Sequence, residues 1–242
     1  MLIERSMSDG FLTNTYLVAS TTGGPGFLVD AGGPMAPLFD AAIRESIDVT
    51  HLLLTHHHHD HVCDIDAVLA RFPKITVLAH PEEQIEVAKP FAPLRIGDVL
   101  VDALHTPGHT AGMLNFVIDG HVFTGDTLFK RSIGGVRAAG STSFEDIKRS
   151  IMDELMATLD DDTEVHPGHT EPTTIGDEWE HNPFIRVWRG LDPEGDEQVT
   201  VGGEPATLVV WGDDYDGGHK AWVRWPDRRD DIVPGSQVER AS

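Results

Sequence analysis

Residues 51–61 read His-Leu-Leu-Leu-Thr-His-His-His-His-Asp-His, a short apolar run that leads into a segment rich in histidine. The apolar part predicts a buried strand. In an extended segment, residues two apart point the same way, so His56 and His58 can converge on one metal ion. As the chain turns into the following helix, Asp60 and His61 can reach a second ion. The intervening histidines point away, and we expect them to make packing or solvent contacts.

Two later segments repeat the sequence Pro-Gly-His-Thr, at residues 107–110 and 167–170. Each copy follows a predicted strand. A tight Pro-Gly turn at the end of a strand holds the next side chain in a fixed direction. This arrangement favours His109 and His169 as further metal ligands.

The histidine-rich segment resembles the His-x-His-x-Asp-His signature of the metallo-beta-lactamase superfamily, and the resemblance continues in order through His109, Asp126 and His169. The similarity covers roughly residues 10–175. It implies an α+β fold, a four-layer αβ/βα sandwich with the metal centre at one edge of its two sheets. It also implies a first metal site of His56, His58 and His109, a second of Asp60, His61 and His169, and Asp126 as the bridge between them.

The implied ligand set has a definite chemistry. Imidazoles with few carboxylates suit zinc, and also iron or manganese in a mixed nitrogen and oxygen shell. Two ions about 3.5–4 Å apart can share a hydroxide, because metal binding lowers the pKa of water from about 15.7 to about 7. No separate general base is then needed at neutral pH, and Asp60 is the expected catalytic residue, which orients the hydroxide. We therefore expect two divalent ions, zinc first among them, in a binuclear metallohydrolase.

Asp126 also indicates a branch of the family. An aspartate at the bridging position resembles the glyoxalase II group, which hydrolyses thioesters, and related lactonases. The run Gly125-Asp-Thr-Leu-Phe129 is similar to that group. The chain departs from the glutathione-dependent members in residues 130–137, which lack their Cys-Gly-Arg/Lys-Phe-type segment, and in its β-like C-terminus. The expected reaction is hydrolysis of a thioester, as in hydroxyacylglutathione hydrolases, or of a related ester or lactone by a metal-bridging hydroxide, with the carrier thiol left open.

Three basic residues, Lys130, Arg131 and Arg137, follow this motif in an otherwise acidic chain. Basic side chains bind carboxylates through charge-assisted hydrogen bonds. The cluster is therefore a candidate for binding a substrate carboxylate. The alternative is that all three are solvated surface cations.

Other functions compete with ester hydrolysis. Persulfide oxidation at a single iron would use His56, His109 and Asp126, as a resemblance to persulfide dioxygenases implies. A phosphodiesterase or nuclease is disfavoured by the net charge of −22, from 18 basic and 40 acidic residues, because an acidic surface repels phosphate backbones. The non-enzymatic alternative is a binding protein with a vestigial metal site and exposed aromatic residues near the C-terminus. Those residues are Trp211, Tyr215, Trp222 and Trp225, for which a small core is the preferred interpretation.

The composition of the chain shifts near Gly190. Residues 1–190 are expected to form a metallo-beta-lactamase-like hydrolase domain, and residues 191–242 a small β-rich C-terminal module. Strands are predicted in that module over 198–201, 206–211 and 220–225.

The most clearly marked helix begins at Ser143, which with Asp146 predicts a capping-box-like turn. Its apolar stripe consists of Phe144, Ile147, Ile151, Leu155 and Leu159. A shorter helix is expected over residues 81–88, beginning at a proline. Between the two, the dipeptide Asp119-Gly120 predicts a hairpin.

The composition also bounds where the protein works. The 242 residues include one cysteine, Cys63, so no disulfide can form within the chain and a reducing compartment fits. No apolar run approaches the roughly 20 residues that cross a bilayer, and the acidic residues near the N-terminus do not suit a signal peptide. We expect a cytoplasmic protein with a small-molecule substrate, and neither nucleic acid nor a membrane as its partner.

Overall fold

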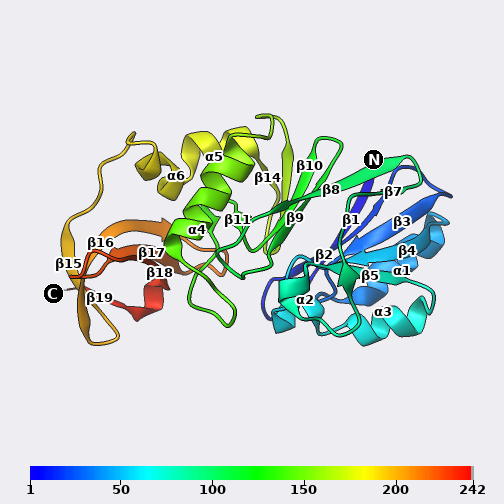
Figure 1. Ribbon diagram of the computed structural model, residues 1–242, viewed down its shortest axis with the longest axis horizontal. Helices are drawn as coiled ribbons and strands as arrows, with labels where there is room; N and C mark the ends of the chain where they lie inside the picture. The colour runs from blue at the N-terminus through cyan, green and yellow to red at the C-terminus, as the bar shows by residue number, and fades with distance from the viewer. Residues whose placement is uncertain (241–242) are drawn as a thin grey trace.

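Two six-stranded sheets face each other in the computed structural model, which describes residues 1–240 (Figure 1). The first sheet has the order β1-β2-β3-β4-β5-β6; it is antiparallel over its first three strands and parallel from β3 onward. Its strands are β1 (Leu2–Met7), β2 (Asn14–Ala19), β3 (Pro25–Val29), β4 (Asp48–Leu53), β5 (Thr76–Ala79) and β6 (Lys89–Pro90).

The second sheet has the order β14-β13-β10-β9-β8-β7, and only β10 and β13 pair in parallel. Its strands are β7 (Leu94–Ile96), β8 (Val99–His105), β9 (Leu114–Ile118), β10 (His121–Gly125), β13 (Glu164–Pro167) and β14 (Thr173–Thr174). The predicted hairpin joins β9 to β10. Its two turn residues, Asp119 and Gly120, both have positive φ angles, as the tightest hairpin turns require.

Alternating residues of β2 show how the layers form. Leu17 is buried in a cluster with the apolar face of the outer helices α1 (Met35–Arg44) and α3 (Ile65–Arg71). Tyr16 and Val18 are buried against residues of the second sheet, among them Phe123. Because successive side chains of a strand point to opposite faces, this one strand contributes to two cores.

The second sheet is covered on its other side by a further helical layer. The predicted helix that follows Ser143 begins with α4 (Phe144–Arg149) and continues as the π-helical segment η2 (Ser150–Met156). Ile147, Ile151 and Leu155 of its stripe are fully buried. Two helices that the sequence did not reveal complete the layer, α5 (Ile175–His181) and α6 (Pro183–Trp188). The predicted four-layer α+β sandwich is therefore confirmed.

The C-terminal strands form a five-stranded antiparallel sheet of order β18-β17-β16-β15-β19, in which the last strand returns to pair with the first. Its elements are β15 (Glu197–Val201), β16 (Glu204–Asp213), β17 (His219–Arg224), β18 (Asp230–Pro234), the 3-10 turn η3 (Gly235–Gln237) and β19 (Val238–Arg240). Figure 1 shows this sheet beyond α4 and α6, at the opposite end of the molecule from β1–β6. Trp222 and Ile232 share a buried cluster with Phe144 and Phe184 of the helical layer. The division of the chain into residues 1–190 and 191–242 stays a prediction.

Some short elements differ from expectation. The helix expected over 81–88 is a single 3-10 turn, η1 (Pro81–Glu83), which ends because Gln84 adopts a left-handed conformation. A small hairpin not foreseen, β11 (Leu128–Phe129) with β12 (Ser132–Ile133), follows the segment containing Asp126. Residues 1–240 contain no helix with the length and hydrophobicity that a bilayer crossing requires.

Candidate metal centre

Four chain segments end at the same edge of the sandwich. β4 runs into the histidine segment, where His58 is extended and immediately precedes α2 (His59–Val62). β10 is followed directly by Asp126, and its parallel neighbour β13 is followed by His169. Because these two strands are paired up to their last residues, their carboxyl ends lie side by side. His109 lies in the loop after β8.

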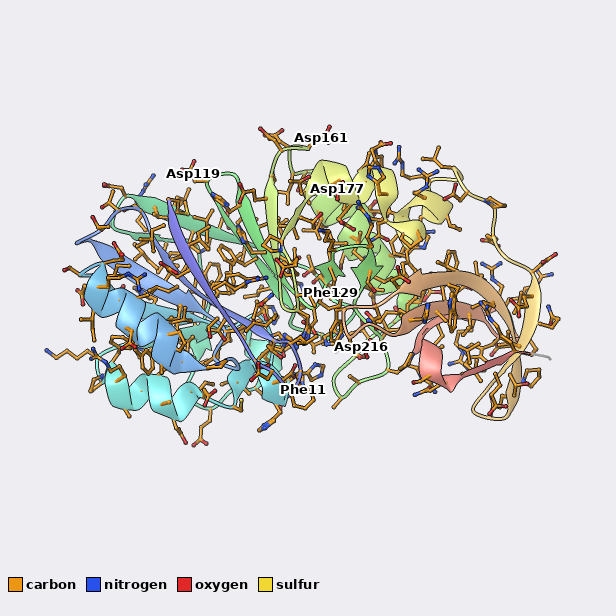
Figure 2. The ribbon with its side chains drawn as sticks, turned by 180° about the vertical axis from the view of Figure 1, so that it is seen from behind. Phe11, Asp119, Phe129, Asp161, Asp177 and Asp216 are labelled. Atoms are coloured by element: carbon orange, nitrogen blue, oxygen red, sulfur yellow. The ribbon has the colours of Figure 1, made fainter. Side chains whose placement is uncertain are left out.

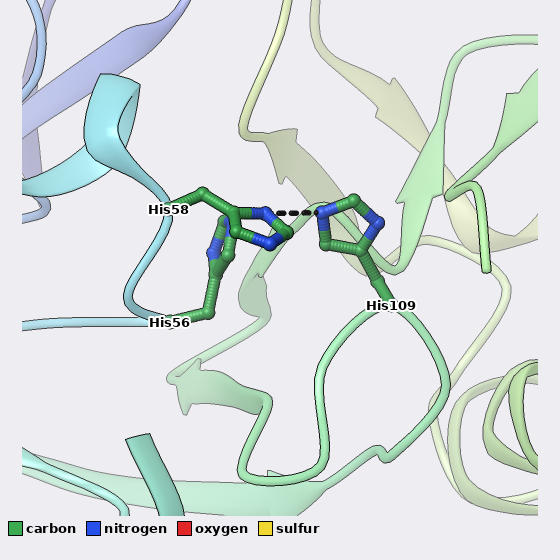
Figure 3. A group of neighbouring side chains, drawn as sticks. All are labelled: His56, His58 and His109. Atoms are coloured by element: carbon green, nitrogen blue, oxygen red, sulfur yellow. Dashed lines mark hydrogen bonds between the residues drawn. The ribbon is translucent and has the colours of Figure 1, made fainter. Parts of the chain in front are cut away.

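The structure brings all seven predicted ligands together. They form three overlapping groups, in each of which one ligand atom per residue lies within 4.8 Å of the others. The groups are His56, His58 and His109; His56, His61 and Asp126; and Asp60, His61 and His169. Figure 3 shows the first group, in which His58 Nδ1 and His109 Nε2 are 2.8 Å apart. The first and third groups have the composition of the two predicted sites.

Asp126 lies between these two groups. Its Oδ1 is 3.2 Å from His61 Nε2, and its Oδ2 is 3.4 Å from His109 Nε2 and 3.2 Å from His169 Nε2. One carboxylate therefore faces histidines of both groups. This is the position that a bridging ligand requires.

Each of the five histidines is held through the ring nitrogen that faces away from the centre. His58 Nε2, His109 Nδ1 and His169 Nδ1 donate to the backbone carbonyls of Ala139, Gly135 and Phe11 at 2.8, 2.8 and 2.9 Å. His61 Nδ1 lies 2.8 Å from Asp30 Oδ2, and His56 Nδ1 lies 3.0 Å from Thr55 Oγ1. Such contacts fix the tautomer and orientation of metal-ligating imidazoles. The remaining nitrogen of each ring is thereby left for the centre.

Three buried atoms at the centre, His56 Nε2, His61 Nε2 and Asp126 Oδ1, make no hydrogen bond of normal geometry with the described residues, although the last two lie 3.2 Å apart. Leaving a buried polar atom unpaired costs about 1–3 kcal/mol. Imidazole nitrogens and carboxylate oxygens are the donor set that zinc, iron and manganese bind. Divalent metal ions therefore fit this site, because they would satisfy the atoms that the protein leaves unpaired.

The charges of the centre act on one another. Burial by itself raises the pKa of the Asp126 carboxyl, but His169 and His61 outweigh that effect and hold this pKa well below its usual range. Burial lowers the pKa of His109 to about 4 and holds that of His56 well below its usual range. At His61, Asp126 and Asp30 outweigh burial and raise the pKa well above its usual value. Metals bind the ionised carboxylate and the neutral imidazole, so an ion that binds here would displace a proton from His61.

Asp60, the predicted catalytic residue, is partly exposed and is held by Thr13, whose hydroxyl donates to Asp60 Oδ2 at 2.9 Å. The same oxygen is 3.6 Å from both His61 Nε2 and His169 Nε2. The two histidines expected to point away from the centre do not belong to its ligand groups. His57 contacts Glu83, and His59 is exposed.

Two buried carboxylates support the centre, and sequence reasoning missed both. Asp30 contacts His61 and also accepts from the Thr55 hydroxyl, at 2.8 Å, so it bears on two ligand-carrying segments. Glu83 accepts from the backbone N–H of His57 at 2.8 Å and from the Thr110 hydroxyl at 2.7 Å. It thereby ties the histidine segment to the loop that carries His109. A lone acidic residue far along the chain from its partners gives no sequence signal for such a role.

The two Pro-Gly-His-Thr turns need their glycines for packing. A Cβ atom on Gly168 would overlap Asp126 Oδ1. Gly108 has a φ angle of +150°, and a Cβ atom there would lie 2.5 Å from the Cβ atom of Ile147 in α4. The glycines therefore let the turns approach the centre and the helical layer.

A pocket of about 260 Å³ opens onto the centre at His109 and Asp126, and part of its wall comes from the C-terminal sheet. Tyr215, in the β16–β17 loop, stacks on the His169 ring with centroids 4.0 Å apart and planes 10° from parallel. Lys220 of β17 is buried and donates to the Ile133 carbonyl at 2.9 Å. Figure 2 labels Phe129 and Asp216, two more lining residues, at this junction. No pattern in the sequence indicated that Tyr215 or Lys220 would reach the site.

The three basic residues predicted to bind substrate have different surroundings. Arg137 is a lining residue of this pocket, and its guanidinium lies 3.2 Å from Gln237 Oε1 and 3.8 Å from Asp231 Oδ2, two residues that line a neighbouring pocket. Arg131 lies in ion pairs with Asp177 and Glu178, at 2.8 and 3.3 Å. Lys130 is exposed and is not among the residues that line the pocket. The structure therefore brings only Arg137 of the three to the centre's pocket.

The aromatic residues of the C-terminal part are mostly core. Trp222 and Trp225 are buried, and Trp211 packs against the cluster inside the sheet. Tyr215 packs on a predicted metal ligand, as described above. These four aromatic side chains therefore pack inside the described part of the protein, as the small-core interpretation expects.

Comparisons with known proteins agree with this geometry. The sequence profile of the metallo-beta-lactamase superfamily matches residues 8–100 and 91–169. An uncharacterized protein of Mycobacterium tuberculosis is 33% identical over 221 residues, covering 76% of this chain and 98% of that protein. A hydroxyacylglutathione hydrolase of Tolumonas auensis is 31% identical over 163 residues, covering 64% of this chain and 61% of that enzyme.

A solved structure is also similar. ETHE1 from Myxococcus xanthus superimposes with a TM-score of 0.67 and 26% sequence identity, covering 79% of this chain and 92% of that one. The matched profile ends at His169, so the C-terminal sheet lies outside it. The matching sequence profile, the similar relatives and the shared fold together show that the chain belongs to the metallo-beta-lactamase superfamily, most of whose members are metal-dependent hydrolases.

Proposed function

We propose that the protein hydrolyses a thioester, or a related activated ester or lactone, with the help of two divalent metal ions, zinc first among the candidates. The observation that carries the proposal is the place of Asp126, whose carboxylate faces histidines of both ligand groups. A centre for one ion at His56, His109 and Asp126 would leave the group Asp60, His61 and His169 without an ion. The similarity to a hydroxyacylglutathione hydrolase supports the thioester as the substrate class.

The chain's residues divide the work. His56, His58 and His109 would hold one ion, Asp60, His61 and His169 the other, and Asp126 both. Bound divalent ions supply a water molecule activated at neutral pH and a Lewis acid for the oxygen of the scissile carbonyl. Asp60, fixed by the Thr13 hydroxyl, lies where it can orient the attacking water.

The pocket indicates the size and character of the acyl group. Its volume of about 260 Å³ is slightly below the range of about 300–1,000 Å³ that takes a drug-sized ligand. Apolar side chains of the C-terminal sheet, Ile232 and Val233, lie beside Phe129 in its wall. We propose that the pocket takes a small acyl group and that Arg137 binds a carboxylate on the substrate.

A screen with metal-quantified protein tests the proposal. The substrates are a set of acyl thioesters with different carrier thiols, lactones and phosphodiesters, each assayed on protein whose zinc, iron and manganese contents have been measured. We expect thioester or lactone turnover that scales with metal content. Phosphodiester turnover alone, or full thioester turnover in a sample without metal, would refute the proposal.

A second candidate is persulfide oxidation at a single iron. It is supported by the similarity to ETHE1 and by its expected ligands His56, His109 and Asp126, all of which lie in the centre, with His109 Nε2 3.4 Å from Asp126 Oδ2. Oxygen consumption with glutathione persulfide distinguishes the two. Uptake of oxygen by protein that contains about one iron per chain would favour the dioxygenase. Its absence, together with thioester turnover, favours the hydrolase.

A further inference from the structure

A second group of metal-binding side chains lies at the other end of the strands that lead to the metal centre. His121 begins β10 and Glu164 begins β13, and the two residues are paired in the parallel register. His166 lies two residues after Glu164 and therefore points to the same face of the sheet. At about 3.3 Å per residue, this group lies roughly 10–16 Å along the strands from His169 and Asp126.

Figure 2 shows the separation of the two ends. Asp119 and Asp161, which lie shortly before β10 and β13, are at one edge of the molecule, whereas Phe129 and Phe11 lie near the metal centre. None of the three residues His121, Glu164 and His166 belongs to the ligand groups of the centre.

One atom of each residue faces one atom of each of the other two: His121 Nδ1, His166 Nε2 and Glu164 Oε2. His121 Nδ1 lies 3.1 Å from His166 Nε2 and 3.5 Å from Glu164 Oε2. His166 Nε2 lies 3.8 Å from Glu164 Oε2. A tetrahedral zinc ion with bonds of about 2.0–2.1 Å holds its ligand atoms about 3.3–3.4 Å apart. The three distances fall on either side of that value, as expected for a triangle of ligands around one ion.

The metal centre itself gives an internal comparison. Ligand atoms there are separated by similar distances, for example 3.2 Å between His61 Nε2 and Asp126 Oδ1 and 3.6 Å between His61 Nε2 and Asp60 Oδ2. The group His121, Glu164 and His166 consists of two imidazoles and one carboxylate, and its ligand atoms are spaced like those of the candidate metal centre.

The surroundings of His166 favour a metal over an ion pair. Its ring is buried, stacks on Phe123 with centroids 4.7 Å apart and meets the edge of Tyr16 at 5.6 Å. Burial, together with His121 and Arg5, lowers the pKa of His166 to about 4. The ring is therefore neutral near pH 7, the form that binds a metal rather than the form that pairs with the Glu164 carboxylate.

We propose that His121, Glu164 and His166 form an additional binding site for a single divalent ion of the zinc class, independent of the proposed hydrolase activity. A pocket of about 470 Å³, lined also by Arg5 and Glu171, adjoins the three residues. Three protein ligands leave one position of a tetrahedral ion for water. The ion therefore exchanges with the solvent through this pocket.

The test counts the zinc ions that the full-length protein binds. Protein stripped with a chelator is titrated with Zn²⁺ near pH 7.5, and bound zinc is measured by calorimetry and elemental analysis. We expect the variants Glu164→Gln and His121→Ala each to bind about one ion fewer than the unaltered protein. Their rates in the assay of the metal centre should change by less than about twofold, because neither residue touches that centre.

Two further variants separate this site from the centre. Glu171→Gln, which alters an acid in the same pocket, should bind as much zinc as the unaltered protein. In Asp126→Ala, which removes a ligand of the centre, Glu164→Gln should still remove about one ion. Crystals soaked in Zn²⁺ should give an anomalous peak among the three atoms. Equal zinc binding by Glu164→Gln, His121→Ala and the unaltered protein, or no peak at this place, would overturn the proposal whatever the centre's activity proves to be.

Discussion

Asp30 illustrates how much of the centre depends on a residue that does not face it. Its backbone has a φ angle of +60°, its Oδ2 contacts His61 Nδ1, and its Oδ1 accepts from the Thr55 N–H at 2.8 Å. The left-handed conformation is costly for most residues and least so for Asn, Asp and Gly. Asp30 therefore combines a backbone conformation that it tolerates with a charge that orients a ligand.

The substitution Asp30→Asn tests that charge, because asparagine tolerates the same backbone conformation. We expect metal affinity to fall by about 10–100-fold, the usual effect of losing a partner of a ligating histidine. Titration against a competing chelator measures this. Asp119→Asn is a matched control, since Asp119 also has a positive φ angle but is exposed in a hairpin turn. An unchanged affinity in Asp30→Asn would show that the carboxylate does not support His61.

Asp126→Ala tests the bridging assignment. Removing this carboxylate leaves His61, His109 and His169 without the anion that faces them. We expect the protein to lose most of its bound metal and nearly all of its activity, measured by elemental analysis and by the thioester assay. Asp213→Ala, at a side chain that is 90% exposed, is the control. Retention of both metals with full turnover would contradict the assignment.

The seven candidate ligands were predictable from the sequence because each stands in a short motif directly after a strand or turn. Asp30 and Glu83 were not, because their partners lie many positions away and a single acidic residue has no pattern. Lys130 and Arg131 show the converse case. A run of basic residues looks like one cluster in the sequence, but Arg131 lies in ion pairs with Asp177 and Glu178.

At the scale of elements, the helix that begins after Ser143 was correctly predicted from a local sequence pattern, a capping residue followed by an apolar stripe. The Ser143 hydroxyl accepts from the Asp146 N–H at 3.1 Å and donates to Asp146 Oδ2 at 2.8 Å. The stripe residues Ile147, Ile151 and Leu155 follow at steps of four. Residues four apart lie on one face of an α-helix, and the second half of this helix widens into a π-helical segment.

Ser143→Ala should destabilise the protein by about 1 kcal/mol through loss of the cap, a fall of about 2–4 °C in Tm for a chain of this size. Burial raises the pKa of Asp146, but Ser143 and Arg149 outweigh it and the net pKa is lowered. A carboxyl whose pKa is lower in the folded than in the unfolded protein stabilises the fold at pH values above its unfolded pKa. That stabilisation is lost as the pH falls through the folded pKa. The part of the Tm difference that depends on the Asp146 carboxylate should therefore begin to shrink as the pH falls below about 3.9, the unperturbed pKa of an Asp side chain, and it is lost as the pH falls through the lower pKa of folded Asp146. Ser143→Thr keeps the hydroxyl and should restore Tm; an equal loss in both variants would refute the capping account.

Other elements were not predictable for a physical reason. The helix expected over 81–88 stops after one turn. At that point the Glu83 carboxylate accepts hydrogen bonds from His57 and Thr110, which lie outside its own segment. Helix α5 was missed because one of its fully buried positions is an acid, Glu178, which accepts from the Asn182 side chain at 2.9 Å. An apolar periodicity cannot reveal a face that is completed by paired polar groups.

On the scale of the whole molecule, the C-terminal sheet is joined to the rest by a shared core. Its strands were visible in the sequence, but their topology was not, so the contact of Tyr215 with His169 could not be foreseen. Trp222 lies 5.0 Å from Phe144 between ring centroids, and α6 packs on β16. A sheet that shares a core with the helical layer and a stacking contact with the metal centre is expected to unfold with them.

Thermal unfolding with two local probes tests this coupling. Three of the five tryptophans, Trp211, Trp222 and Trp225, lie in the C-terminal part, so in a variant carrying Trp179→Phe and Trp188→Phe the tryptophan emission reports on that part. The single cysteine, Cys63, is exposed beside α2, so an attached dye reports on the other end. We expect the two midpoints to agree within about 2 °C, as in a cooperative transition, and a chelator to lower both together, because ligand loss destabilises the whole cooperative unit. A tryptophan transition well below that of the dye, and unmoved by the chelator, would instead mean that residues 191–242 fold and unfold as an independent module.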